Sequence, residues 1–227
     1  MGIPEHYSRD IPSRCQTLID NLWPSVKRGF SGDRAFGGPL STTFLLALAT
    51  PMIVLPTERI LKLLERRPGQ VGDEREVDPE LDQRIAKAFS PGVTFGVAPF
   101  RRGGRWSYVA NWERFNIARD WPQELLHSLA EPEAAKSADE APAKQIIFDL
   151  RNALAHGGVA YLDAEGRQTQ GEAAMLAFAA AARSGRSALN ILRVSEDDFL
   201  LFLQSWAQWL AKPRIRRILN QMDPLAA

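Results

Sequence analysis

The stretch "AKQIIFDLRNALAHGG", residues 143–158, decides how the centre of the chain folds. Its apolar side chains recur at the spacing of one buried helical face: Ile146, Leu150, Ala153 and Leu154. Pro142 suits the first turn of such a helix. Gly157 suits the left-handed residue that follows many helix ends. The sequence therefore predicts a helix over about residues 141–156.

The end of this helix carries three polar side chains that could form a site: Arg151, Asn152 and His156. The arginine and the histidine lie about 140° apart on an ideal helix, so they can meet only if the helix ends at the histidine. A guanidinium fork matches phosphate oxygens. An imidazole that titrates near neutrality can give or take a proton. Asparagine adds neutral donors and an acceptor.

A second interpretation of the same residues stays open. Arg151 could pair with Asp149 or with an acidic loop, while His156 only caps backbone carbonyls. Asp149 itself is either a group that orients Arg151 or a plain surface charge. The spacing of the residues does not decide between these interpretations.

Composition excludes several classes of protein. The chain of 227 residues suits one domain, and its net charge of +1 gives no general attraction to nucleic acid or to an anionic membrane. Any contact with nucleic acid must then come from a local patch. The single cysteine, Cys15, and the three histidines argue against a disulfide and against a Cys-rich or multi-His metal site. We expect neither a metal nor a cofactor.

The longest apolar run, Phe44–Pro56, is shorter than the roughly 20 residues that a bilayer requires. It contains two prolines and leads directly into Glu58 and Arg59. The run therefore predicts a buried core helix with a kink or break near Pro51. The N-terminus lacks the apolar segment of a signal peptide, so a cytoplasmic protein without membrane contact is expected.

The remaining pattern predicts a mainly α-helical chain with a small accessory antiparallel sheet. Helices are expected at about residues 10–28, 41–67, 80–89, 121–130 and 195–212. Strands are expected at 93–100 and 106–115, which flank a Gly-Gly turn, and at 159–162 and 188–194. Residues 173–182 fit a helix or a strand, and residues 131–142 are expected to form a polar loop.

Two further groups of residues are weaker candidates for a site. The predicted hairpin "RRGGRWSYVANWERF" offers basic and aromatic groups that could grip single-stranded RNA: Arg101, Arg102, Arg105 and Trp106. The alternative is a solvated hairpin whose aromatic rings pack inward. Glu58 and Arg59 are expected to serve an internal ion pair, with a contribution to the cleft as the alternative.

The segment "DLRNALAHGG" closely resembles the motif of the HEPN superfamily, with Arg151, Asn152 and His156 at the three motif positions. The blocks "TTFLLALATPMIVLPTERI", "YLDAEGRQT" and "FLLFLQSWAQWL" are similar to a bacterial HEPN subfamily first named from a plasmid-encoded reading frame. The resemblance implies a helical bundle in one domain, 1–227, with an N-terminal helical extension (about 1–35) and a strand-rich insertion after the motif helix (about 158–194).

The resemblance also implies a function. Active HEPN proteins are metal-independent endoribonucleases in which two protomers join their motifs in one cleft, and many act as toxins or in antiviral defence. We therefore expect a homodimer that cleaves RNA to 2′,3′-cyclic phosphate ends, with an antitoxin or defence partner. Arg151, Asn152 and His156 would be catalytic. The alternative is a non-catalytic HEPN module that binds RNA or nucleotide, or that regulates a partner by dimerisation.

Overall fold

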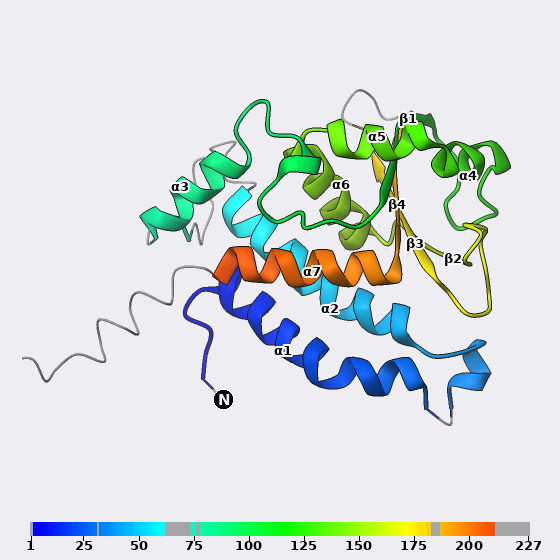
Figure 1. Cartoon of the computed structure of the whole chain (residues 1–227), viewed down its shortest axis with the longest axis horizontal. Helices are drawn as coiled ribbons and strands as arrows, with labels where there is room; N and C mark the ends of the chain where they lie inside the picture. Colours follow the sequence, from blue (N-terminus) through cyan, green and yellow to red (C-terminus); the bar gives the residue numbers. More distant parts are fainter. Residues whose placement is uncertain (1, 31, 62–73, 76–77, 183–186, 212–227) are drawn as a thin grey trace, which may run out of the picture.

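The predicted central helix is α6 (Ala143–His156) in the structure of the chain, a computed structural model. The structure describes residues 2–30, 32–61, 74–75, 78–182 and 187–211 (Figure 1). The other helices are α1 (Tyr7–Arg28), α2 (Ser41–Pro56), α3 (Pro79–Ala88), α4 (Gln123–Ala130), α5 (Pro132–Glu140) and α7 (Glu196–Ala211). The strands are β1 (Trp106–Glu113), β2 (Val159–Leu162), β3 (Met175–Ala181) and β4 (Ala188–Ser195).

Helix α2 lies at the centre of the helical layer, in contact with α1, α6 and α7 (Figure 1). Its core-facing side chains have no exposed surface: Leu45, Ala49, Met52 and Ile53. The indole Nε1 of Trp206 in α7 donates to the carbonyl oxygen of Met52 at 2.8 Å. The pair Lys27–Glu196, at 2.6 Å, connects α1 to α7. The first helix is thus packed into the core.

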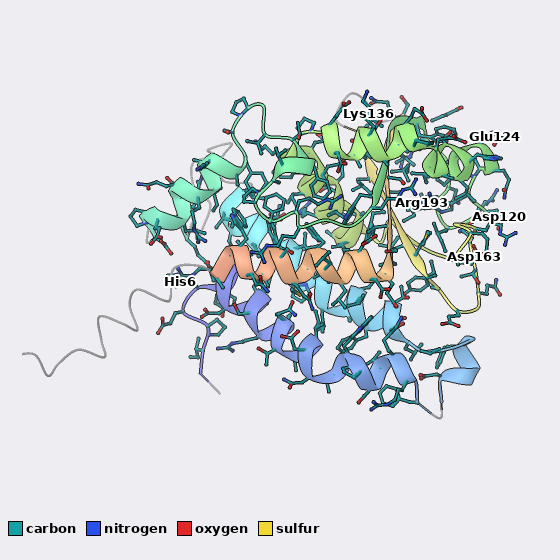
Figure 2. All side chains as sticks on the ribbon, viewed as in Figure 1. His6, Asp120, Glu124, Lys136, Asp163 and Arg193 are labelled. Carbon is teal, nitrogen blue, oxygen red and sulfur yellow. The ribbon has the colours of Figure 1, made fainter. Side chains whose placement is uncertain are left out.

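The four strands form one antiparallel sheet in the order β1-β4-β3-β2. Successive side chains of a strand point to opposite faces, and both faces are covered here. Leu192 and Val194 of β4 join the core of α6 and α7, whereas Leu189 and Ile191 pack with α4. On the α4 side, the guanidinium of Arg193 donates to the carbonyl oxygen of Leu129 at 2.6 Å (Figure 2).

Two expected elements are wrong. Residues 93–100 do not form a strand: Phe95–Val97 is a short 3-10 turn, and β1 pairs with β4 instead. Residues 131–142 are not a polar loop, because they contain α5. Ala134 and Ala138, four residues apart, form the buried face of that helix, a pattern that its polar composition conceals.

The sheet is not confined to the segment after the motif helix. Residues 173–182, which fitted either a helix or a strand, contain the buried strand β3. Strands β2, β3 and β4 follow α6, as expected, but β1 precedes it.

Helix α2 passes through Pro51 without a break and ends at Pro56. A π-helical turn, Thr57–Leu61, continues it, and the expected residues 62–67 lie outside the described residues. The combined segment Ser41–Leu61 is long and apolar enough to cross a membrane by length and composition alone. In the structure this helix fills the centre of the helical layer.

Candidate functional site at the end of helix α6

Helix α6 ends as its sequence predicts. Gly157 takes the left-handed conformation with φ 71° and ψ 23°, which glycine adopts at little cost. His156 is therefore the last helical residue, and it is exposed. Gly158 is needed for a different reason: a Cβ there would collide with the carbonyl oxygen of Ala179 in β3. The two glycines allow the chain to turn directly from α6 into the sheet.

Arg151 is partly buried, with 17% of its side chain exposed. One terminal nitrogen, Nη1, donates to Oδ1 of Asn152 at 2.6 Å. The other, Nη2, forms an ion pair with Oε1 of Glu58. A guanidinium can only donate hydrogen bonds, so it fixes the orientation of the Asn152 amide. The amide nitrogen of Asn152 is then left to donate to a ligand.

Glu58 comes from the π-helical turn that follows α2. Its neighbour Arg59 pairs with a different residue, Glu74, at 3.1 Å. Both residues form ion pairs, as the sequence predicts, but with partners distant in the sequence. Glu58 therefore forms the expected kind of ion pair, and its partner is Arg151 of the motif.

An ion pair and a hydrogen bond join Glu58, Arg151 and Asn152, whereas His156 lies five residues beyond Arg151 along the helix. Arg151 and Asn152 lie in α6, Glu58 follows α2, and His156 stands exposed at the helix end. Within the described part of the chain, the His156 imidazole makes no hydrogen bond or ion pair. A guanidinium such as that of Arg151 can hold an anion, and an exposed imidazole such as that of His156 can exchange a proton.

A comparison with known families places this geometry in context. The sequence model of the family HEPN pEK499 p136 matches residues 1–217 of the chain. The chain belongs to the HEPN pEK499 p136 family. No curated protein and no solved structure matches it. The family match includes the first 35 residues and with them α1, which packs against α2 and α7.

Asp149 of this HEPN chain is not a surface charge. It is 2% exposed, and its carboxylate accepts hydrogen bonds from three side chains. The donors are the hydroxyl of Tyr108 at 3.1 Å and the amides of Asn190 at 3.1 Å and Gln145 at 2.8 Å. Because Tyr108 and Asn190 belong to β1 and β4, Asp149 fastens α6 to the sheet.

The basic and aromatic candidates of the predicted hairpin do not form a stacking surface. Trp106 is 1% exposed and packs edge-on against Phe95 and Phe202, so its ring cannot stack on a base. Arg101 donates to the carbonyl oxygen of Gly104 at 2.7 Å.

The remaining two arginines lie near α7. Arg102 donates to Oε1 of Gln208 at 2.9 Å, and the backbone N–H of Arg105 donates to Asp198 at 2.9 Å. Within the described residues, neither arginine forms a hydrogen bond or ion pair with Arg151 or with His156.

Metal ligands are not clustered in the part of the chain that the structure describes, which has no group of three or more His, Cys, Asp or Glu side chains suited to a metal. Cys15 is a buried free cysteine, and burial raises the pKa of its thiol. A raised pKa keeps the thiol protonated, so Cys15 acts as a small core side chain.

Glu58 has a closer connection to the motif than its sequence context indicates. The signal was present, because a charged pair directly after a long apolar helix is unusual for a core segment. Its partner could not be read from the sequence, since 93 positions separate Glu58 from Arg151 and the contact depends on how α2 crosses α6.

Proposed function

We propose that this protein is a metal-independent endoribonuclease of HEPN type that acts on RNA as a homodimer. The observation that carries the proposal is the helix end itself: an anchored arginine, an oriented asparagine and an exposed histidine, in a chain of a HEPN family. These are the groups that the cleavage of a phosphodiester at an adjacent 2′-hydroxyl requires.

The reaction forms one bond and breaks another. The RNA 2′-oxygen attacks the neighbouring phosphorus, and the bond from phosphorus to the 5′-oxygen breaks to give a 2′,3′-cyclic phosphate and a 5′-hydroxyl. One His156 accepts the proton of the 2′-hydroxyl or supplies the proton of the leaving oxygen, and the second protomer's copy supplies the other role. Arg151 stabilises the charge on the phosphorane oxygens, and Asn152 orients the phosphate.

The test uses purified protein with mixed RNA in EDTA. We expect the wild type to cleave, and His156→Ala and Arg151→Ala each to lose about 10²–10³-fold in rate, the effect of removing one group that stabilises the transition state. His127→Ala is the matched control, because His127 is an exposed histidine on α4. Arg28→Ala, an exposed arginine on α1, is the control for Arg151.

One observation favours a second function. The Arg151 guanidinium is already paired with a carboxylate, which reduces its attraction for a phosphate. Of the non-catalytic HEPN alternatives, a module that regulates a partner by dimerisation fits this pair better than one that binds RNA or nucleotide, because it needs no free guanidinium. In that case the wild type leaves RNA intact in EDTA.

The partner and the place of action follow from the same proposal. In a sedimentation experiment a homodimer would have twice the mass of one chain. A strict monomer would leave each half of the cleft incomplete. A role as a toxin or in antiviral defence, with a matching antitoxin or defence partner, and a cytoplasmic location complete the proposal. Co-expression with genes encoded beside it, followed by growth measurement, tests that role.

A further inference from the structure

The guanidinium of Arg151 is held from two sides. Nη1 donates to Asn152, and Nη2 pairs with Glu58. The Nε atom is buried and has no hydrogen-bond partner among the described residues. Only the remaining hydrogens of the two terminal nitrogens are thus available to a phosphate, and their direction depends on the two groups that hold the guanidinium.

The π-helical turn places Glu58 at this position. Thr57 begins the turn, and its hydroxyl donates to the carbonyl oxygen of Ile53 at 2.6 Å. Ile60 and Leu61 have no exposed surface, so the turn is anchored in the core on both sides of Glu58. One-turn π-helical segments are frequently found at functional sites, because the wider turn redirects side chains.

Arg59 also anchors the π-helical turn, through contacts with Glu74 and with the first turn of α1. Its guanidinium pairs with Glu74 at 3.1 Å and lies 4.4 Å from the ring centre of Tyr7. Glu74 in turn accepts hydrogen bonds from the backbone N–H groups of Tyr7 and Ser8, both at 2.9 Å, at the first turn of α1. Two adjacent residues therefore contact opposite neighbours, and the backbone between them has little freedom to move.

We infer that Glu58 is the positioning residue for Arg151 in the RNA cleavage reaction, an inference that rests on the proposed function. The arginine side chain is flexible, and an anchored carboxylate restricts its rotamers before substrate binds. Glu58 itself does not touch the phosphate. Its contribution lies in directing the guanidinium, so its loss affects the transition state more than the binding of RNA.

Three variants test this role by steady-state kinetics on one RNA. Glu58→Ala is expected to lower kcat about 10- to 100-fold, the cost of a misplaced catalytic group, with KM changed less than kcat. Glu58→Gln keeps the size of the side chain and an oxygen beside Nη2 but removes the charge of the ion pair, so its kcat should fall between Glu58→Ala and the wild type. Lys27→Ala breaks the ion pair with Glu196, which lies between α1 and α7, and is expected to keep kcat.

Three kinetic results would overturn the inference. One is a Glu58→Ala variant with the kcat of the wild type. A second is a Glu58→Ala variant that binds RNA more tightly and cleaves faster, because Glu58 would then compete with the phosphate for Arg151. A fall in kcat that Lys27→Ala reproduces at equal loss of stability would also overturn it, since the effect would come from weakened packing.

A second measurement separates this inference from the proposed function. In ¹⁵N NMR of the full chain, the Nε–Hε signal of Arg151, assigned with Arg151→Lys, reports how tightly the guanidinium is held. Glu58→Ala should broaden or shift it, and an unchanged signal would overturn the inference. If wild type and His156→Ala leave RNA equally intact, the proposed function fails, and this NMR result alone decides whether Glu58 holds Arg151.

Discussion

Replacing Asp149 tests whether this buried carboxylate fastens α6 to the sheet. In Asp149→Leu, the hydroxyl of Tyr108 and the amide of Asn190 lose the acceptor they share, and both residues are buried, at 7% and 5% exposure. A buried donor without a partner costs about 1–3 kcal/mol. The two donors together predict a loss of about 2–6 kcal/mol in the free energy of unfolding.

Asp149→Asn provides the contrast. Its amide oxygen can face Tyr108 and Asn190, while its amide nitrogen faces Gln145, whose own amide can turn to offer an oxygen. We therefore expect a loss of about 1 kcal/mol or less. RNA cleavage per folded molecule should stay unchanged, because Arg151 takes its partner from Glu58.

Urea unfolding, followed by circular dichroism, measures the free energy of unfolding of both variants. Equal m-values for the variants and the wild type are the check on two-state behaviour. Two results would refute the reasoning. The first is an Asp149→Leu variant as stable as the wild type. The second is an Asp149→Asn variant that loses as much stability as Asp149→Leu, because the loss would then come from the missing charge and not from the missing acceptor.

Three other predictions concern stability. Gly158→Ala should lower the free energy of unfolding by about 1–3 kcal/mol, because its Cβ overlaps the Ala179 carbonyl. An unchanged melting temperature would disprove that close approach. Trp106→Ala should lose about 3–5 kcal/mol in urea unfolding, without weaker RNA binding by the folded fraction. Burial and the Asp149 carboxylate raise the pKa of Tyr108. The contribution of its neutral hydroxyl to the free energy of unfolding is therefore fully present below about pH 10 and decreases at higher pH. Tyr108→Phe should show a shallower fall between pH 10 and 12, and an equal slope would contradict this.

The helix ends were the part of the fold that the sequence predicted best, because their signals are local. Gly157 takes the expected left-handed conformation. The helix expected from about residue 195 begins directly after Ser195, whose hydroxyl accepts from the N–H of Asp198 at 3.1 Å. Local signals gave wrong predictions where the pairing partner is distant in the sequence. Strand β1 pairs with β4, about 80 positions later, so no hairpin forms at the Gly-Gly turn that precedes it.

The candidate site likewise contains residues that local sequence identifies and residues that depend on distant contacts. Arg151, Asn152 and His156 could be named from their spacing and from the family resemblance, because all three lie in one helix and its end. Glu58 could be predicted only as an alternative, and burial excludes the surface charge that was one of two interpretations of Asp149. Both depend on contacts between elements: Glu58 on the crossing of α2 and α6, and Asp149 on donors from two strands.

The most direct test of the central claim uses one RNA with a mapped cleavage site and a copy in which only the nucleotide before that site lacks its 2′-hydroxyl. The account predicts that the wild type, in EDTA, cuts the first substrate to a 2′,3′-cyclic phosphate and a 5′-hydroxyl, and leaves the second intact at that site. It further predicts that His156→Ala loses this activity while His127→Ala keeps it. Cleavage of the deoxy substrate at the same site, or equal rates for wild type and His156→Ala, would contradict the account.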